Sequence, residues 1–233
     1  MIAEADIAAV GALIGDRARA SMLNALMSGE AISAGELARL GGVSPSGATA
    51  HLRRLREGGL VVDEPAGRQR VFRLASPELA EALEALALVA PPIPVRGLRE
   101  AKAAGAMKRA RTCYDHLAGE LGVTVTDALV DRDVLARDDG SGFAVTRAGD
   151  IWLEELGLDL GALRRARRSF ARGCVDWTER RPHLAGSLGA GIATTFFARG
   201  WVRRRPGGRA LAVTAAGAAW LDDTLGIGGL HAA

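Results

Sequence analysis

An internal repeat in the second half of the chain sets the strongest limit on the fold. The segment 116–122, HLAGELG, recurs 67 residues later as HLAGSLG at 183–189, with six identities in seven. Residues 144–153 recur 68 residues later at 212–221, with seven identities in ten. Because the offset grows by only one residue across the unit, the pattern indicates a duplicated fold with one insertion.

Each copy has the pattern of a helix, a hydrophobic helix and a β-hairpin. The hairpin strands and turns are expected at 134–137 with 138–142 and at 201–204 with 205–208. Each hairpin returns at a Val-Thr strand and leads into a helix that contains Trp152 or Trp220. This order is the outline of a winged helix, so we predict two degenerate winged-helix-like repeats, at residues 96–160 and 161–233.

The stretch from Gly42 to Leu74 predicts a further helix and hairpin before the repeats. Ser44 is a good N-cap and Pro45 suits the first helical position, where a missing N–H costs nothing. The apolar residues of this helix, which share one face, are Ala48, Leu52 and Leu55. After the glycine pair 58–59, residues 60–62 form the first strand, residues 64–67 the turn, and Gln69 to Leu74 the returning strand.

A short polar helix face beside a basic hairpin is typical of a protein that reads DNA. The helix enters the major groove while arginines of the hairpin meet phosphate or the minor groove. The residues expected to face bases are Ser46, Thr49, Ala50 and Arg53. The residues expected at phosphate or in the minor groove are Ser44, Arg54, Arg68 and Arg70. The alternative is a helix and hairpin whose arginines are merely solvated.

Three segments together resemble the winged helix-turn-helix regulators of the ArsR/SmtB family. They are Asp16-Arg-Ala-Arg at the start of a helix, the S-x-S-x-x-x-x-H-L-x-x-L run from Ser44 to Leu55, and Gly59-Leu-Val entering the hairpin. The resemblance covers roughly residues 5 to 90. It implies a DNA-binding and dimerisation domain at residues 1–90, and a homodimer built from the first and last helices of that domain.

Apolar stripes suit this dimer. They consist of Ile7, Val10, Leu79, Leu83 and Leu86. The stripe at 79–86 has the alternative of covering its own domain or packing on the second half. Prolines at 91, 92 and 94 then predict a stiff linker over residues 91–95. The predicted fold class is therefore mainly α with small β-hairpins (α+β), as one winged helix-turn-helix and two related repeats.

Composition narrows the setting. The chain is 48% hydrophobic and 24% charged, which is ordinary for a globular protein. It has no run of eighteen apolar residues and no secretory leader pattern, so we expect a cytoplasmic protein without membrane contact. Residues 161–233 carry 12 basic and 4 acidic side chains. These arginines either touch the DNA backbone or form a solvated face.

Cysteine and histidine recur together in the two copies. Cys113 precedes His116, and Cys174 precedes His183. In both copies the cysteine begins a Cys-x-Asp segment. Cys113 and His116 are expected on one helix face, at i and i+3. The four residues can hold Zn²⁺ or a softer ion, or the thiols can be oxidised. The alternative is that the cysteines pack as small apolar residues and the histidines bond within their own repeats.

The usual sensing residues of the family resembled are missing. The third helix, 34–40, has no cysteine, and residues 77–90 have no histidine. Aromatic residues offer another route, because an organic effector can occupy a pocket between the copies. The residues expected there are Trp177, Phe197, Trp201 and Trp220. Core packing is their alternative role.

The sequence predicts a DNA-binding transcriptional regulator, a repressor that binds a double-stranded operator as a dimer. Its effector, a small molecule or a metal ion, is expected in the duplicated half. No nucleophile elbow, P-loop or H-E-x-x-H motif occurs, so we expect no enzyme and no cofactor apart from a metal ion. The alternatives are a protein-interaction scaffold and a metal- or thiol-dependent sensor that uses the cysteines and histidines.

Overall fold

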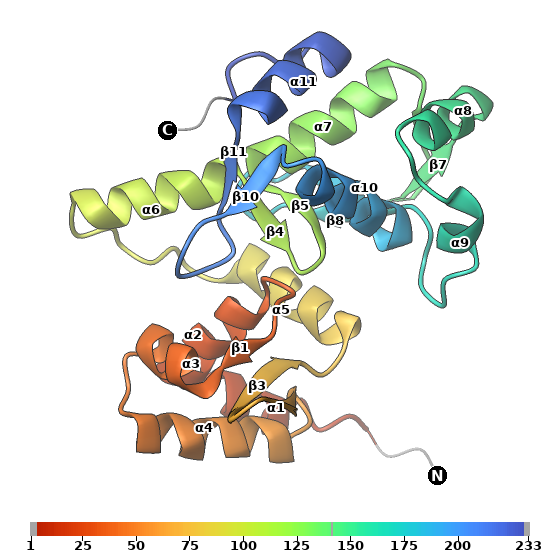
Figure 1. Ribbon diagram of the computed structural model, residues 1–233. Coiled ribbons are helices and arrows are strands. Elements are labelled where there is room, and N and C mark those ends of the chain that lie inside the picture. The colour runs from red at the N-terminus through yellow and green to blue at the C-terminus, as the bar shows by residue number, and fades with distance from the viewer. Residues whose placement is uncertain (1–3, 141, 231–233) are drawn as a thin grey trace. The chain divides into compact units, whose positions relative to one another are not determined.

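The computed structural model describes residues 4–140 and 142–230, and the chain forms two compact units, Met1–Leu83 and Glu84–Ala233 (Figure 1). The division lies within helix α5 (Pro77–Val89) rather than at the predicted linker, and Glu84 makes its ion pairs with residues of the second unit. None of the helices among these residues is long and apolar enough to span a bilayer.

The first unit is a winged helix-turn-helix with the predicted order of elements. They are α1 (Ile7–Ile14), α2 (Arg17–Leu26), β1 (Ile32–Ser33), α3 (Ala34–Gly41), α4 (Pro45–Glu57), β2 (Val61–Ala66), β3 (Gln69–Leu74) and α5 (Pro77–Val89). The sheet order is β1-β3-β2, with antiparallel pairs. Leucines from α2, α3 and α4 fill the core below this sheet.

Local capping explains where the helices of this unit begin. The side chains of Asp16, Ser33 and Ser44 each accept a hydrogen bond from a backbone N–H three residues later. Pro45 occupies the first turn of α4, as predicted. Gly42, with φ of +66°, ends α3 in the left-handed conformation and so makes the turn into α4.

The turn of the β2–β3 hairpin differs from the prediction of residues 64–67. The strands pair as far as Ala66 and Gln69, so the connection is Gly67-Arg68. Pro65 lies within β2, opposite Arg70. An edge strand tolerates proline because the missing N–H faces away from the sheet. Gly67 has φ of +61°, which a two-residue turn readily uses.

The second unit contains the two repeats, each with one hairpin more than predicted. The first has α6 (Leu98–Arg109), β4 (Arg111–Cys113), β5 (His116–Ala118), α7 (Gly119–Asp131), β6 (Leu135–Arg137), β7 (Phe143–Val145) and α8 (Arg147–Glu155). The second has α9 (Leu160–Arg164), β8 (Arg172–Val175), β9 (Pro182–Ala185), α10 (Gly186–Ala198), β10 (Val202–Arg204), β11 (Leu211–Val213) and α11 (Ala215–Leu225). Residue 141, in the predicted turn between β6 and β7, lies outside the described residues.

The repeats are not separate domains, because they share one hydrophobic core. Leu121 of α7 and Leu188 of α10 are both fully buried in a single cluster that also includes Trp201. Strand β5 of the first copy contacts α10 of the second, and β9 of the second copy contacts α7 of the first. The core is therefore built only when both copies are present.

Equivalent glycines show that the copies keep the same backbone. Gly119 and Gly186 start α7 and α10 with φ of +73° and +79°, and each faces a backbone carbonyl too closely for a Cβ. Thr146 and Thr214 cap α8 and α11 by accepting from the N–H of Gly149 and Gly217. The repeat found in the sequence is thus a structural repeat.

Candidate DNA-binding surface and a buried cysteine–histidine cluster

Helix α4 presents the predicted polar face. Ala48, Leu52 and Leu55 are buried in the first unit. The predicted contact residues of this helix and its N-cap are all exposed; they are Ser44, Ser46, Thr49, Ala50, Arg53 and Arg54. Helix α4 therefore has one buried apolar face and one exposed polar face. Its N-terminus is also exposed, and backbone N–H groups there favour an anion such as phosphate.

The two wing arginines differ in their surroundings. Arg68 lies in the exposed turn of the hairpin. Arg70 donates to Asp63, which also pairs with Arg56 at 3.4 Å. Burial would raise the pKa of Asp63, but its bonds to Arg70 and Arg56 hold that pKa below its usual value. Arg70 is therefore directed toward Asp63 within the protein, whereas Arg68 extends from the tip.

The residues predicted to form the dimer interface are exposed or half-buried. Ile7 is 78% exposed and Val10 41% exposed on α1. On α5, Leu86 is 45% exposed, while Leu79 and Leu83 are half-buried. Exposed apolar side chains in helical spacing are suited to contact with another surface.

Cys113, His116, Cys174 and His183 lie together in the second unit, but on strands rather than on a helix. The prediction that Cys113 and His116 share a helix face is wrong, because a tight turn at Tyr114, with φ of +61°, separates β4 from β5. Cys113 pairs with His116 across the first hairpin, and Cys174 pairs with His183 across the second. Each repeat therefore contributes one cysteine and one histidine in matching register.

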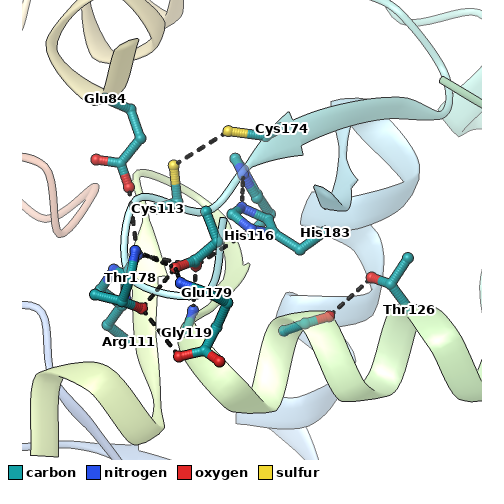
Figure 2. A network of polar contacts seen from close by, with 12 residues as sticks. Glu84, Arg111, Cys113, His116, Gly119, Thr126, Cys174, Thr178, Glu179 and His183 are labelled. Carbon is teal, nitrogen blue, oxygen red and sulfur yellow. Dashed lines mark hydrogen bonds and ion pairs between the residues drawn. The ribbon is translucent and has the colours of Figure 1, made fainter. Parts of the chain in front are cut away.

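The four side chains form a compact and buried group (Figure 2). One candidate ligand atom from each residue lies within 4.8 Å of all the others. The two Sγ atoms are 3.8 Å apart, and the two Nε2 atoms are 3.1 Å apart. No member is more than 9% exposed. The residues that were predicted from the repeat are thus brought to one point.

A carboxylate lies near the Nδ1 atom of each histidine. Asp115 Oδ1 lies 3.2 Å from His116 Nδ1, and Asp176 Oδ2 lies 3.4 Å from His183 Nδ1. Asp115 also accepts from Arg168 at 2.5 Å. Both imidazoles are therefore oriented with Nδ1 toward an acid and Nε2 toward the cluster.

The two thiols have opposite shifts in pKa. The contact with Cys113, helped by hydrogen bonds from both histidines, lowers the pKa of Cys174 to about 2 against the effect of burial. The same contact, together with burial, raises the pKa of Cys113 well above its usual range. Burial would lower the pKa of His183, but Asp176 and Cys174 raise it overall. The two histidines and Cys113 thus favour the thiolate form of Cys174.

A second buried group, of four charged residues, adjoins the cluster. Asp176 is fully buried and accepts from Arg111 at 2.9 Å and from the Gly119 N–H at 2.6 Å. Burial would raise the pKa of Asp176, but His183 and Arg111 hold it far below its usual value. Glu84 of α5 accepts from Arg209 at 3.0 and 3.3 Å and lies 3.9 Å from Arg111.

The aromatic residues predicted to line an effector pocket are divided among separate contacts. Trp201 and Trp220 stack with ring centroids 3.9 Å apart in the hydrophobic core. Phe197 lies 4.7 Å from the Arg204 guanidinium, and Trp177 lies 5.0 Å from that of Arg111. The structure therefore favours packing roles for these side chains.

Sequence reasoning missed the polar residues that support the cluster. The two acids are the central residues of the Cys-x-Asp segments, so the repeat contained a signal for Asp115 and Asp176. Nothing comparable marked Glu84, Arg111 or Arg209, because their partners lie far away in the sequence.

Comparison with known proteins agrees with the N-terminal architecture. Residues 14–64 match a family model described as a helix-turn-helix domain. The chain is 40% identical over 212 residues to the uncharacterized HTH-type transcriptional regulator YdfF of Bacillus subtilis (strain 168), a match that covers 91% of this chain and 93% of that relative. The chain therefore belongs to the HTH-type transcriptional regulators.

Solved structures similar to the chain cover its N-terminal part. One is the homodimeric winged helix-turn-helix DNA-binding domain of Mb0332 from Mycobacterium bovis, a possible ArsR-family transcriptional regulator, with 24% identity and a TM-score of 0.34 over 38% of this chain and 89% of that chain. Another is the cadmium metal-sensor CmtR from Mycobacterium tuberculosis, with 34% identity and a TM-score of 0.32 over 40% of this chain and 99% of that chain.

Proposed function

We propose that this transcriptional regulator is an ArsR-type repressor that binds a double-stranded operator as a homodimer and responds to a ligand held by residues 84–233. The observation that carries the proposal is the exposed polar face of α4 beside an exposed wing arginine. The order of helices and hairpin around that face supports the ArsR-type assignment, together with the three sequence segments that resemble the family.

In this proposal α4 enters the major groove. Arg53 is exposed and pairs only loosely with Glu57, at 3.9 Å, so its guanidinium is available for a base edge. Ser46 and Thr49 lie on the same face and offer hydroxyls. Ser44 and the first turn of α4 provide N–H groups and a hydroxyl for a phosphate. Arg68 adds a contact to phosphate or the minor groove.

The exposed apolar residues of α1 and α5 support a homodimer that these two helices form. Two copies would place two α4 helices about 34 Å apart, the spacing of successive major grooves on one side of DNA. The operator is then expected to contain two inverted half-sites. A bound dimer covers the promoter, and this obstruction accounts for repression.

Fluorescence anisotropy with the promoter-proximal DNA of the protein's own gene tests the proposal. Arg53→Ala should cost about 1–3 kcal/mol of binding free energy and relax sequence preference. Arg68→Ala should weaken binding to all duplexes and lower the slope of log K against log salt by about one. Arg147→Ala, which removes an exposed arginine of the second unit, serves as the control.

The outcome also separates a repressor from a protein-interaction scaffold. A repressor gives a saturable complex that prefers one duplex and, in transcription in vitro, lowers the yield from the bound promoter. The absence of any sequence-selective complex, or an Arg68→Ala variant with unchanged affinity and salt slope, would refute the assignment of α4 and the wing.

A further inference from the structure

We propose that Cys113, His116, Cys174 and His183 form a tetrahedral Zn²⁺ site that joins the two repeats. The site takes one residue of each kind from each hairpin, so the ion would crosslink β4–β5 to β8–β9 (Figure 2). The site itself is independent of DNA binding. Its role as the regulatory ligand rests on the proposed function.

The donor chemistry selects the metal. Two cysteine sulfurs and two histidine nitrogens are the ligand set of structural zinc sites, which are closed and four-coordinate. Soft thiolate ligands disfavour magnesium and calcium, which prefer oxygen. With two thiolates the charge of Zn²⁺ is balanced, which lowers the cost of holding the ion among residues that are at most 9% exposed. Binding releases the remaining thiol protons to solvent.

The sulfur–sulfur and nitrogen–nitrogen distances match those of a tetrahedron around a zinc ion, and all four ligand atoms lie within 4.8 Å of one another. Zinc–sulfur bonds of about 2.3 Å and zinc–nitrogen bonds of about 2.0 Å separate two sulfurs by about 3.8 Å and two nitrogens by about 3.3 Å. The Sγ atoms are 3.8 Å apart, and the Nε2 atoms are 3.1 Å apart. The sulfurs are thus much farther apart than the roughly 2.05 Å of a disulfide bond.

The orientation of the histidines gives independent support. Each Nδ1 faces a carboxylate, at 3.2 Å for His116 and 3.4 Å for His183. If both Nδ1 atoms carry the proton, both Nε2 atoms present lone pairs to one another at 3.1 Å. A cation between them turns this repulsion into coordination. A carboxylate on the second nitrogen is also the usual support of a zinc-bound histidine.

Metal analysis of the full-length chain, purified under reducing conditions, tests the site directly. We expect inductively coupled plasma mass spectrometry to find about one zinc ion per chain. Replacement by Co²⁺ should give the visible bands of tetrahedral cobalt with thiolate ligands. Cys174→Ser should lose these bands and the stoichiometric zinc, while His51→Ala, a histidine of the first unit, should retain both.

A milder variant guards against loss of folding. Asp115 is partly exposed, so Asp115→Asn should fold while weakening zinc affinity by about 10–100-fold, as outer carboxylates do. Asp150→Asn, an exposed carboxylate of α8, is the matched control and should bind zinc as the wild type does. Equal zinc affinity in all three proteins would refute the role of Asp115 in the site.

Thiol counting completes the test. Both thiols should resist a thiol reagent in the zinc-loaded protein and react after a strong chelator removes the ion in denaturant. The proposal fails if the reduced protein contains no stoichiometric metal and gives no cobalt bands, or if the two thiols form a disulfide under the same conditions.

DNA binding is a separate readout. A difference in operator affinity between zinc-loaded and metal-free protein supports zinc as the regulatory ligand. Equal affinity in a protein that holds one zinc per chain would overturn the regulatory role and leave the metal site intact. If the wild-type protein holds zinc but binds no operator DNA in either the zinc-loaded or the metal-free form, the proposed function is refuted and the metal site stands.

Discussion

The buried ion pairs of Glu84 lead to a quantitative prediction. Glu84 is 2% exposed and accepts two bonds from Arg209, which is 4% exposed. Arg111 and Asp176, both fully buried, complete the group of four charges. The net charge of these two carboxylates and two guanidiniums is zero. Glu84→Gln keeps the shape of the side chain and leaves a net charge of +1 in the same place.

The expected loss is large because the remaining charge stays buried. Arg209 loses a carboxylate that contacts it through both oxygens, and Arg111 keeps the carboxylate of Asp176 but loses that of Glu84. Removing one partner of a buried ion pair costs about 3–5 kcal/mol. We expect Glu84→Gln to lower the free energy of unfolding of the second unit by that amount.

The chain provides a local probe for this measurement. Its four tryptophans, at 152, 177, 201 and 220, all lie in the second unit. Urea unfolding followed by tryptophan fluorescence therefore reports on that unit, at a fixed zinc concentration because any ligand shifts apparent stability. The matched control is Asp150→Asn, whose exposed pair with Arg164 should contribute less than about 1 kcal/mol. A Glu84→Gln protein no less stable than this control would refute the reasoning.

Two further substitutions test local features. Ser44→Ala removes the hydroxyl that accepts from the Gly47 N–H at 3.2 Å, so the N-terminus of α4 should lose about 1 kcal/mol of protection in amide hydrogen exchange; unchanged protection would argue against the cap. Gly217→Ala places a Cβ 2.1 Å from the Trp201 carbonyl oxygen and should lower the melting temperature by an amount equivalent to about 1–3 kcal/mol. Gly208→Ala, which has open space, is the control and should melt as the wild type does.

The first unit was predictable because its information is local. Ser44 and Pro45 fix the start of α4, and the spacing of Ala48, Leu52 and Leu55 fixes its buried face. The hairpin turn was misplaced because Pro65 suggested a turn, whereas its position on an edge strand lets it remain extended.

The second unit was harder because its short strands depend on distant partners. Strand β4 is three residues long and wholly buried, so it lacks the alternation that identifies a strand. Cys113 of this strand contacts Cys174, which lies 61 residues later in the sequence. The repeat nevertheless identified the four cluster residues, since equivalent positions in two related hairpins can meet. It had no means of pairing Glu84 with Arg209, which lie 125 residues apart.

The polar groups connect the cluster to α5 through consecutive contacts. His183 lies 3.4 Å from Asp176, Asp176 lies 2.9 Å from Arg111, and Arg111 lies 3.9 Å from Glu84. We expect a ligand that draws His183 toward itself to weaken the interaction of His183 with Asp176, and so to alter the ion pairs of Arg111 with Asp176 and Glu84.

Helix α5 runs from the first unit into the second, so we expect a change at Glu84 to affect the first unit through this helix. We therefore expect Glu84→Gln, at a temperature where it remains folded, to bind one zinc per chain and to show less difference in operator affinity between its zinc-loaded and metal-free forms than the wild type does. Asp150→Asn should keep the full difference. An undiminished difference in Glu84→Gln would show that coupling does not pass through this chain of contacts.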